Sequence, residues 1–258
     1  MSAAPDPSRR RALITGAGQG VGAAIADRLG SARVTVIVND VVADRAHCEV
    51  ERLRSVGVDA EAAVFDVTDY EAVIEAVERL GRVDILVNNA GNAGADQWPG
   101  MVAFHESEPA SWTSYFAVNL FGVMHCTRAV LPAMVRSGWG RVVTILSDAA
   151  RVGEPKLAAY AGAKAGAAGV MRSVANDVAR YGVTVNCVAL GTMRTPLTES
   201  YWASLDDDAM AKRMAAYPIR RPGLPDDVAP LVQFLVSEES SYITGQTIPV
   251  NGGYSMAL

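Results

Sequence analysis

The stretch TGAGQGVG at residues 15–22 decides the fold of this 258-residue chain. It follows a short apolar run at 12–15 and opens a helix expected over 20–30. Glycines at such a turn let the backbone approach a pyrophosphate, whose charge rests on the N-terminus of the helix. The pattern fits T-G-x-x-x-G-x-G and lacks the lysine of a P-loop, which excludes a P-loop nucleotidase. The expected dinucleotide cradle contains Gly16, Gln19, Gly20, Val21 and Gly22.

Outward from this loop, short apolar runs alternate with longer helical patterns. Strands are expected at 12–15, 34–39, 62–65, 83–88, 141–146, 183–188 and 247–250. Helices are expected at 20–30, 43–56, 70–80, 109–136, 158–181 and 226–236, and the segment 191–222 is irregular and partly helical. This alternation is typical of βαβ units. We therefore expect one α/β domain over 1–258, with a doubly wound, seven-stranded parallel sheet and helices on both faces.

Composition and charge exclude several classes of protein. Apolar residues make up 50% and charged residues 20%, as in globular domains, and the net charge of −5 argues against a general nucleic-acid binder. The three cysteines, Cys48, Cys126 and Cys187, form neither a disulfide framework nor a zinc site, and they suit a reducing, cytoplasmic setting. No targeting segment and no run of 18 apolar residues is visible, so no membrane partner is expected. The basic run at 9–11 is expected to belong to a solvated, flexible tail over 1–10.

Asp40 stands at the end of the second expected strand, about 20 residues beyond the glycine loop. An acidic side chain at this place binds the ribose hydroxyls of adenosine and repels a 2′-phosphate. Gln19 and Val41 carry no positive charge, and Arg45 is the nearest cation that would favour the phosphate. We therefore expect the cofactor to be NAD, and the alternative is NADP bound through Arg45.

Two further strand ends carry residues suited to the same ligand. Asp66 and Val67 follow the third expected strand, where a side chain reaches the adenine edge. The motif NNAG at 88–91 follows the fourth, beside the point where the strand order reverses, and ligands bind at such switch points. Alone, NNAG is equally compatible with an ordinary turn. The second group of expected cofactor contacts is Asp66, Val67, Asn89, Ala90 and Gly91.

A second constellation supplies proton chemistry. Tyr160 and Lys164 lie four apart on an expected helix and share one face, and Ser147 follows an expected strand. A tyrosine with its ordinary pKa of about 10 is a poor base at neutral pH, and a nearby lysine charge lowers that pKa. The serine hydroxyl then holds the substrate oxygen while Tyr160 moves the proton. The pattern Y-x-x-x-K is weak alone, but with Ser147, the glycine loop and NNAG in register it becomes a strong indication of a proton-transfer site.

With these motifs in place, the sequence resembles the short-chain dehydrogenase/reductase family over almost its whole length. The resemblance implies a single-domain Rossmann fold in which Tyr160 is the general acid/base. It implies that Lys164 binds the nicotinamide ribose and lowers the tyrosine pKa, and that Ser147 polarises the carbonyl or alcohol. It further implies that Asn119 bends its helix and holds a relay water. The resemblance is carried by TGAGQGVG, Asp40, Asp66, Val67, NNAG, Asn119, Ser147 and YAGAK at 160–164.

One position departs from the family pattern. The family usually has Pro-Gly after the sixth strand, and this chain has Leu190 and Gly191. Gly191 still permits close approach to nicotinamide, whereas loss of the proline ring loosens the loop. Met193 and Thr195 stand where a backbone amide and a hydroxyl would hold the carboxamide. The resemblance also implies a homotetramer, with a dimer as second choice, built on the small residues of 158–181 and on the helix at 109–136.

The substrate end gives less specific signals. The run SDAARVG at 147–153 is similar to family members that act on hydroxyacyl thioesters, and Arg151 would meet a phosphate or carboxylate there. A surface arginine is the alternative, and steroids, sugars, polyols and simple ketones stay open as substrates. The segment 191–222 is expected to form a substrate lid, although its apolar residues equally suit packing against the sheet. Candidate pocket side chains are Met210, Met214, Tyr217, Tyr201 and Trp202, together with Trp98.

Two other function classes compete with an NAD-dependent dehydrogenase. A non-catalytic dinucleotide sensor uses the same fold but needs no proton-transfer group, so the intact Ser147, Tyr160 and Lys164 argue against it. An epimerase or dehydratase needs a larger substrate domain than the region after residue 183 provides. No metal is expected, because the histidines His47, His105 and His125 are scattered without metal-ligand spacing.

Overall fold

A seven-stranded parallel sheet, in the order β3-β2-β1-β4-β5-β6-β7, runs through residues 9–92 and 102–256, the part of the chain that the computed structural model describes. This order reverses between β1 and β4, which confirms the predicted doubly wound sheet and its switch point. All the expected strands are present, with ends shifted by a few residues. They are β1 (Arg11–Ile14), β2 (Thr35–Asp40), β3 (Ala60–Val64), β4 (Ile85–Asn88), β5 (Gly140–Ser147), β6 (Val183–Leu190) and β7 (Thr247–Val250).

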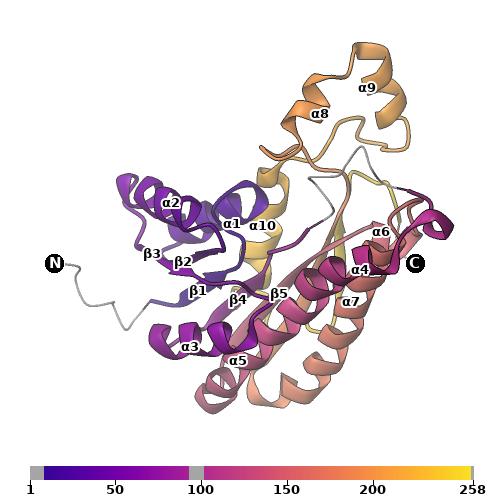
Figure 1. Ribbon diagram of the computed structural model, residues 1–258. Coiled ribbons are helices and arrows are strands. Elements are labelled where there is room, and N and C mark those ends of the chain that lie inside the picture. Colours follow the sequence, from indigo (N-terminus) through magenta and orange to yellow (C-terminus); the bar gives the residue numbers. More distant parts are fainter. Residues whose placement is uncertain (1–8, 93–101, 257–258) are drawn as a thin grey trace.

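Helices cover both faces of the sheet (Figure 1). One face carries α1 (Gly20–Ser31), α2 (Ala43–Ser55) and α10 (Pro225–Leu235). The other carries α3 (Tyr70–Leu80), α5 (Val123–Ser137) and α7 (Ala158–Val178). The shorter elements are η2 (Phe104–Glu106), α4 (Pro109–Phe116), η3 (Ala117–Gly122), α6 (Ala149–Val152), η4 (Ala179–Tyr181), α8 (Glu199–Ala203) and α9 (Asp207–Met214).

The core consists of two apolar layers, one on each face of the sheet. Val36 and Val38 of β2 pack with the layer under α1 and α10, while Ile37 between them packs with the layer under α5 and α7. Successive side chains of a strand point to opposite faces of the sheet. A strand that is buried on both faces therefore consists of a continuous run of apolar residues. This is why the strands could be recognised from short uninterrupted apolar runs.

The helical stretch expected over 109–136 is not uniform. A π-helical turn, η3, separates α4 from α5 and contains the buried Asn119. By length and composition alone, the stretch Pro109–Ser137 is long and apolar enough to cross a membrane, although it contains no uninterrupted run of 18 apolar residues. Its α5 part packs Val123, Cys126 and Val130 against the sheet, as a core helix of a folded domain does. Packing against the sheet therefore accounts for the apolar residues on the inner face of α5.

The segment 191–222 forms a separate small layer above the carboxyl ends of the strands, with α8 and α9 in orange at the top of Figure 1. Trp202, Met214 and Tyr217 are buried together in an apolar cluster of their own. The indole N–H of Trp202 donates to the carbonyl of Met193 at 3.1 Å. The expectation of an irregular, partly helical segment is thus matched by two short helices around their own cluster.

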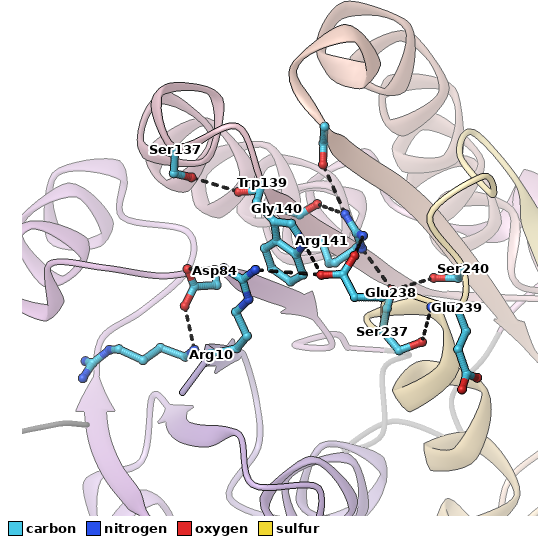
Figure 2. Close-up of polar contacts among 12 residues, drawn as sticks. Arg10, Asp84, Ser137, Trp139, Gly140, Arg141, Ser237, Glu238, Glu239 and Ser240 are labelled. Atoms are coloured by element: carbon cyan, nitrogen blue, oxygen red, sulfur yellow. Dashed lines mark hydrogen bonds and ion pairs between the residues drawn. The ribbon is translucent and has the colours of Figure 1, made fainter. Parts of the chain in front are cut away.

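At the opposite end of the sheet, a cluster of charged side chains surrounds Trp139 (Figure 2). The guanidinium groups of Arg10 and Arg141 lie 3.7 Å and 4.5 Å from the centre of the indole ring. Arg11 is buried in β1. The prediction of a solvated basic tail is therefore wrong for Arg11, whose guanidinium donates to the carbonyl of Arg82 at 2.9 Å. Arg10 is exposed, but it also contacts the fold through the Trp139 ring and through ion pairs with Asp84 and Glu238. Residues 1–8 lie outside the described part.

Glu238 joins this cluster, and its removal should lower stability. Its carboxylate accepts from the indole N–H of Trp139 at 2.7 Å and from the buried Arg141 at 3.3 Å. Because the carboxylate is mostly exposed, we expect Glu238→Gln to cost about 1 kcal/mol of unfolding free energy and about 2–4 °C in Tm. Thermal and urea denaturation measure this loss. The control is Glu239→Gln, which removes the same charge one position away; equal losses in both variants would contradict the prediction.

Candidate active site

Thr15 fastens the glycine loop to the NNAG loop. Its hydroxyl accepts the backbone N–H groups of Asn89 and Ala90, each at 3.0 Å. The side-chain amide of Asn89 donates back to the carbonyls of Thr15 and Gly16 at 2.9 Å and 3.0 Å. Because β1 and β4 are neighbours, the two loops, predicted separately from the sequence, form one continuous surface at the switch point.

The start of α1 is arranged to receive an anion. No side chain caps the helix at Gln19, and its first turn contains no acidic residue. The free N–H groups and the helix dipole therefore present positive charge to the loop. Gly16 has φ +61°, and a Cβ on Gly22 would lie 2.5 Å from the Asn89 amide nitrogen. The residues present thus fit a pyrophosphate, which needs close backbone approach.

Asp40 and Arg45 face the same loop from β2 and α2. Asp40 is buried, and its Oδ1 accepts the N–H of Val42 at 3.0 Å. The Arg45 guanidinium lies 4.0 Å from that oxygen. A Cβ on Gly18 would lie 2.7 Å from both Asp40 Oδ2 and Arg45 Cβ, so glycine is required for this approach. A carboxylate and a guanidinium therefore stand side by side at this edge of the loop.

Ser147, Tyr160 and Lys164 converge at the carboxyl end of β5. Ser147 is the last residue of this strand, and α7, which carries the other two, packs against β5 and β6. The Ser147 hydroxyl accepts the N–H of Ala149 at 3.2 Å, and it lies close enough to Tyr160 to lower the pKa of the phenol. Lys164 is buried, and its ammonium donates to the carbonyl of Ile145 at 2.9 Å. The sequence spacing therefore translates into one shared site.

Burial shifts the pKa values of Tyr160 and Lys164 in opposite directions. It raises the pKa of Tyr160 to about 12, against a lowering by the Ser147 hydrogen bond, and the Glu154 carboxylate raises it further. The predicted net lowering of the Tyr160 pKa is thus wrong for the protein alone, because desolvation of the phenolate outweighs the groups that stabilise it. Burial lowers the pKa of Lys164 to about 8. Around neutral pH, Tyr160 is a phenol and Lys164 is still mostly an ammonium.

Asn119 connects the π-helical turn to the NNAG loop. Its side-chain amide donates to the carbonyls of Tyr115 and Asn92, each at 2.9 Å, and its oxygen accepts the N–H of Asn92 at 3.3 Å. A Cβ on Gly91 would lie 3.0 Å from this oxygen and 3.2 Å from Lys164 Nζ. The helix is thus irregular where the resemblance predicted a bend, while the relay water stays a prediction.

A single cavity of about 1330 Å³ joins the cradle to the Tyr160 region and to the segment 191–222. It is open to solvent along one side, and Tyr201 and Trp202 of α8 contribute to its wall. No group of three His, Cys, Asp or Glu suited to a metal ion exists among the described residues. The sequence-predicted residues that line the cavity are Gly16, Gln19, Gly20, Val21, Asp40, Asp66, Val67, Asn89, Ala90, Gly91, Ser147, Tyr160, Lys164, Gly191, Met193 and Thr195.

Several candidates lie outside this wall. Gly22 and Asn119 support the loops from behind, and Met214 and Tyr217 are buried in the apolar cluster of the segment 191–222, against which Met210 packs. Arg151 turns away to bind Asp148 at 2.9 Å. Trp98 lies outside the described residues.

Sequence reasoning missed one wall of the cavity. It is formed by the aromatic side chains of Trp112 and Tyr115 on α4 and by Glu154 in the loop before α7. The Tyr115 ring stands edge-on to Tyr160, with 6.3 Å between the ring centres. The available signal was the i, i+3 spacing of Trp112 and Tyr115 on a helix that follows the NNAG loop.

Comparison with known proteins agrees with this arrangement. Residues 16–255 match the family model described as Enoyl-(Acyl carrier protein) reductase. A 3-oxoacyl-(acyl-carrier-protein) reductase of Staphylococcus aureus is 36% identical over 252 residues, covering 96% of this chain and 98% of the relative. A hydroxy(phenyl)methylsuccinyl-CoA dehydrogenase subunit of Thauera aromatica is 36% identical over 251 residues, covering 96% and 97%. The crystal structure of gluconate 5-dehydrogenase from Burkholderia cenocepacia, in complex with NADP and tartrate, is similar with a TM-score of 0.88, 33% identity and 96% of each chain covered.

Fold and cavity together define a nucleotide-binding oxidoreductase of the α/β class. With relatives of this identity over almost the full chain, the assignment becomes narrower: the protein belongs to the short-chain dehydrogenase/reductase family.

Proposed function

We propose that this protein interconverts a secondary alcohol and a ketone with NAD(H) as cofactor. The observation that carries the proposal is the placement of Ser147, Tyr160 and Lys164 in the same cavity as the glycine loop. When bound along that loop, the nicotinamide accepts or donates the hydride. A secondary alcohol carbon beside it then needs a group that moves the hydroxyl proton, and Tyr160 is the phenol placed to do so.

The three side chains divide the proton chemistry between them. Ser147 donates a hydrogen bond to the substrate oxygen and holds it beside the Tyr160 hydroxyl. In ketone reduction, Tyr160 gives its proton to this oxygen as negative charge develops there. The Lys164 ammonium lies one helical turn away and stabilises the phenolate that remains. Alcohol oxidation runs through the same positions in reverse.

Asp40 supports NAD over NADP. Its second carboxylate oxygen faces the loop next to Gly18, where it suits ribose hydroxyls as a hydrogen-bond acceptor. A 2′-phosphate at this place would meet that negative charge. Arg45 favours the opposite choice, and the similar structure from Burkholderia cenocepacia was solved with NADP. The buried Asp40 should outweigh the half-exposed Arg45, because a buried charge is less screened by salt.

The proposed substrate is a hydroxyacyl or oxoacyl thioester. The names of the relatives from Staphylococcus aureus and Thauera aromatica support this class, since both act on acyl groups carried as thioesters. The aromatic wall of Trp112 and Tyr115 provides apolar surface for an acyl chain. Arg151 is not part of this proposal, because its guanidinium binds Asp148 and Ser255.

The direct test is nicotinamide absorbance during turnover of a substrate panel. The panel contains hydroxyacyl-CoA thioesters, gluconate-like polyols, a steroid alcohol and a simple secondary alcohol, each with NAD+ and NADP+. Turnover of a thioester with NAD+ is the expected result. Turnover of the polyol alone would overturn the substrate class, and tight NADH binding without any turnover would favour the sensor.

We also propose one catalytic domain with 191–222 as its substrate lid, assembled into a homotetramer. The support for assembly is apolar surface on η3 and α5, where Phe121 and Met124 are 49% and 38% exposed. Exposed apolar side chains on one helical stretch are typical of interfaces. Light scattering on a sizing column measures the assembly, and a monomer mass would refute it.

The pH dependence of turnover should differ between the two directions. With a Tyr160 pKa of about 12, the phenol that reduction needs is present throughout the range from about pH 6 to pH 9. The rate of ketone reduction should therefore not change with pH below about pH 8. Above the Lys164 pKa of about 8, the lysine loses its charge and the rate should fall. Oxidation needs the phenolate, so its kcat/KM should rise with pH. The control is Lys164→Arg, which stays charged; an unchanged inflection in that variant would contradict the assignment.

A further inference from the structure

Asp148 is a buried carboxylate that the proposed proton transfer does not use. It follows Ser147 in the chain and is 1% exposed. Its Oδ1 accepts from the Arg151 guanidinium at 2.9 Å. Its Oδ2 accepts from the Asn251 amide and, at 2.8 Å, from the Ser255 hydroxyl. A buried charge is tolerated only when it is paired and hydrogen-bonded, so this set of donors is needed where Asp148 lies.

Two of the three donors come from a distant segment of the chain. Asn251 and Ser255 are 103 and 107 positions away from Asp148. The segment between them is a compact turn in which the Asn251 amide also donates to the carbonyl of Ser255 at 2.8 Å. Gly252 and Gly253 have φ of +60° and +83°, which favours glycine at both positions. Asp148 thus holds a defined structure, residues 251–255.

The same turn is attached to the segment 191–222. The Tyr254 ring stacks on Tyr217 with 4.7 Å between ring centres and an angle of 15° between the planes. The N–H of Ile219 donates to the carbonyl of Gly252 at 3.1 Å. Tyr217 in turn belongs to the apolar cluster of Trp202, which lines the cavity. Contacts therefore run without a gap from Asp148 to the wall of the cavity.

A second contact connects the turn with the catalytic side. Burial raises the pKa of the Tyr254 hydroxyl, and the charge of the Glu154 carboxylate, which lines the cavity, raises it further. A Cβ on Gly191 would lie 2.9 Å from Asn251 Cα, so the turn also packs directly against the floor of the cavity. The turn is thus in contact with both sides of the space in which a substrate would lie.

We propose that Asp148 is a positioning residue, which aligns the lid with Ser147 by anchoring the turn 251–255 to the end of β5. The kinetic part of this inference rests on the proposed function, while the structural part does not. Without the carboxylate, the turn 251–255 is no longer bound beside Ser147 and becomes more mobile. Because Tyr254 stacks on Tyr217, the segment 191–222 becomes more mobile as well. Ser147 then holds the substrate oxygen less accurately against Tyr160.

The test compares Asp148→Ala with Asp84→Ala in the otherwise intact protein. Asp84 is the matched control, because it is a buried carboxylate that accepts the Arg11 N–H at 2.8 Å and pairs with arginines at the far end of the sheet (Figure 2). Both variants should melt at lower temperature. Hydrogen exchange of the amides at 199–220 should accelerate in Asp148→Ala only. The kcat/KM of that variant should fall about ten- to a hundredfold, since a misplacement of about 1 Å can cost about 100-fold.

Each outcome decides the inference. Faster exchange that spreads to 199–220 in Asp148→Ala supports it, and Ser255→Ala should show the same effect more weakly. Exchange confined to 148–153 overturns it, whatever the rates. An unchanged kcat/KM per folded enzyme overturns it as well. If the wild-type protein turns over none of the panel, the proposed function fails, and the exchange pattern alone still decides the role of Asp148.

Discussion

Replacing Tyr160 with phenylalanine should lower kcat by about 100- to 10,000-fold, the usual contribution of a positioned general acid or base. The substitution removes only the phenol hydroxyl near Ser147, and the aromatic ring still fills its place beside Tyr115. Binding of NADH should therefore change little, because the glycine loop and Asp40 are untouched. Initial rates and a fluorescence titration with NADH measure the two quantities separately.

The matched control for this variant is Tyr115→Phe. Tyr115 lines the same cavity and faces Tyr160, so its loss tests whether any phenol in this place would serve. We expect a decrease of less than about tenfold, as is usual when a group only assists binding. If Tyr160→Phe retained most of its activity, the proton would have to come from elsewhere, and the roles of Ser147 and Lys164 would need to be assigned anew.

The second large effect is a change of cofactor preference in Asp40→Ala. Two like charges about 4 Å apart near a protein surface repel by about 4 kcal/mol. Removing the carboxylate frees Arg45 to pair with a 2′-phosphate, so the ratio of kcat/KM for NADP+ to that for NAD+ should rise about 100-fold once screening by salt is included. Steady-state kinetics with both cofactors give this ratio.

Two control variants distinguish the effect of the Asp40 charge from the effect of removing any negative charge. Asp44→Ala removes an exposed carboxylate from the first turn of α2, and it should leave the ratio unchanged. Asp40→Ala combined with Arg45→Ala should lose most of the gain with NADP+. A wild-type protein that prefers NADP+ would refute the interpretation of Asp40 and make Arg45 the deciding residue.

The fold could be predicted because its signals are local. Each strand is a short apolar run, and the glycine loop fixes how the first strand meets the first helix. Local signals also grouped Ser147, Tyr160 and Lys164, since two of these share a helix face and the third ends a neighbouring strand. The cavity brings these residues together with the loop that the sequence had identified independently.

What could not be predicted depends on contacts between distant parts of the chain. The bonds from Asp148 to Asn251 and Ser255 have no pattern in the sequence, because each partner is an ordinary polar residue until the sheet brings them together. The raised pKa of Tyr160 depends on burial by several elements at once, which spacing along one helix does not reveal. The π-helical turn coincides with a hydrogen bond from the Asn119 side chain to the carbonyl of Asn92, 27 positions away, which local spacing does not reveal.

The position of β1 in the interior of the sheet, between β2 and β4, has a consequence for the kinetics of folding. Every strand pair is parallel, so no tight hairpin is available to nucleate the sheet. The bond from the Arg11 N–H to Asp84, beside the β1–β4 pair, spans 73 positions. During synthesis, β1 leaves the ribosome first and stays unpaired on this side until β4 follows. Such non-local pairing makes folding slow. Until β4 pairs with it, the apolar strand β1 has an unpaired edge at which other chains can aggregate.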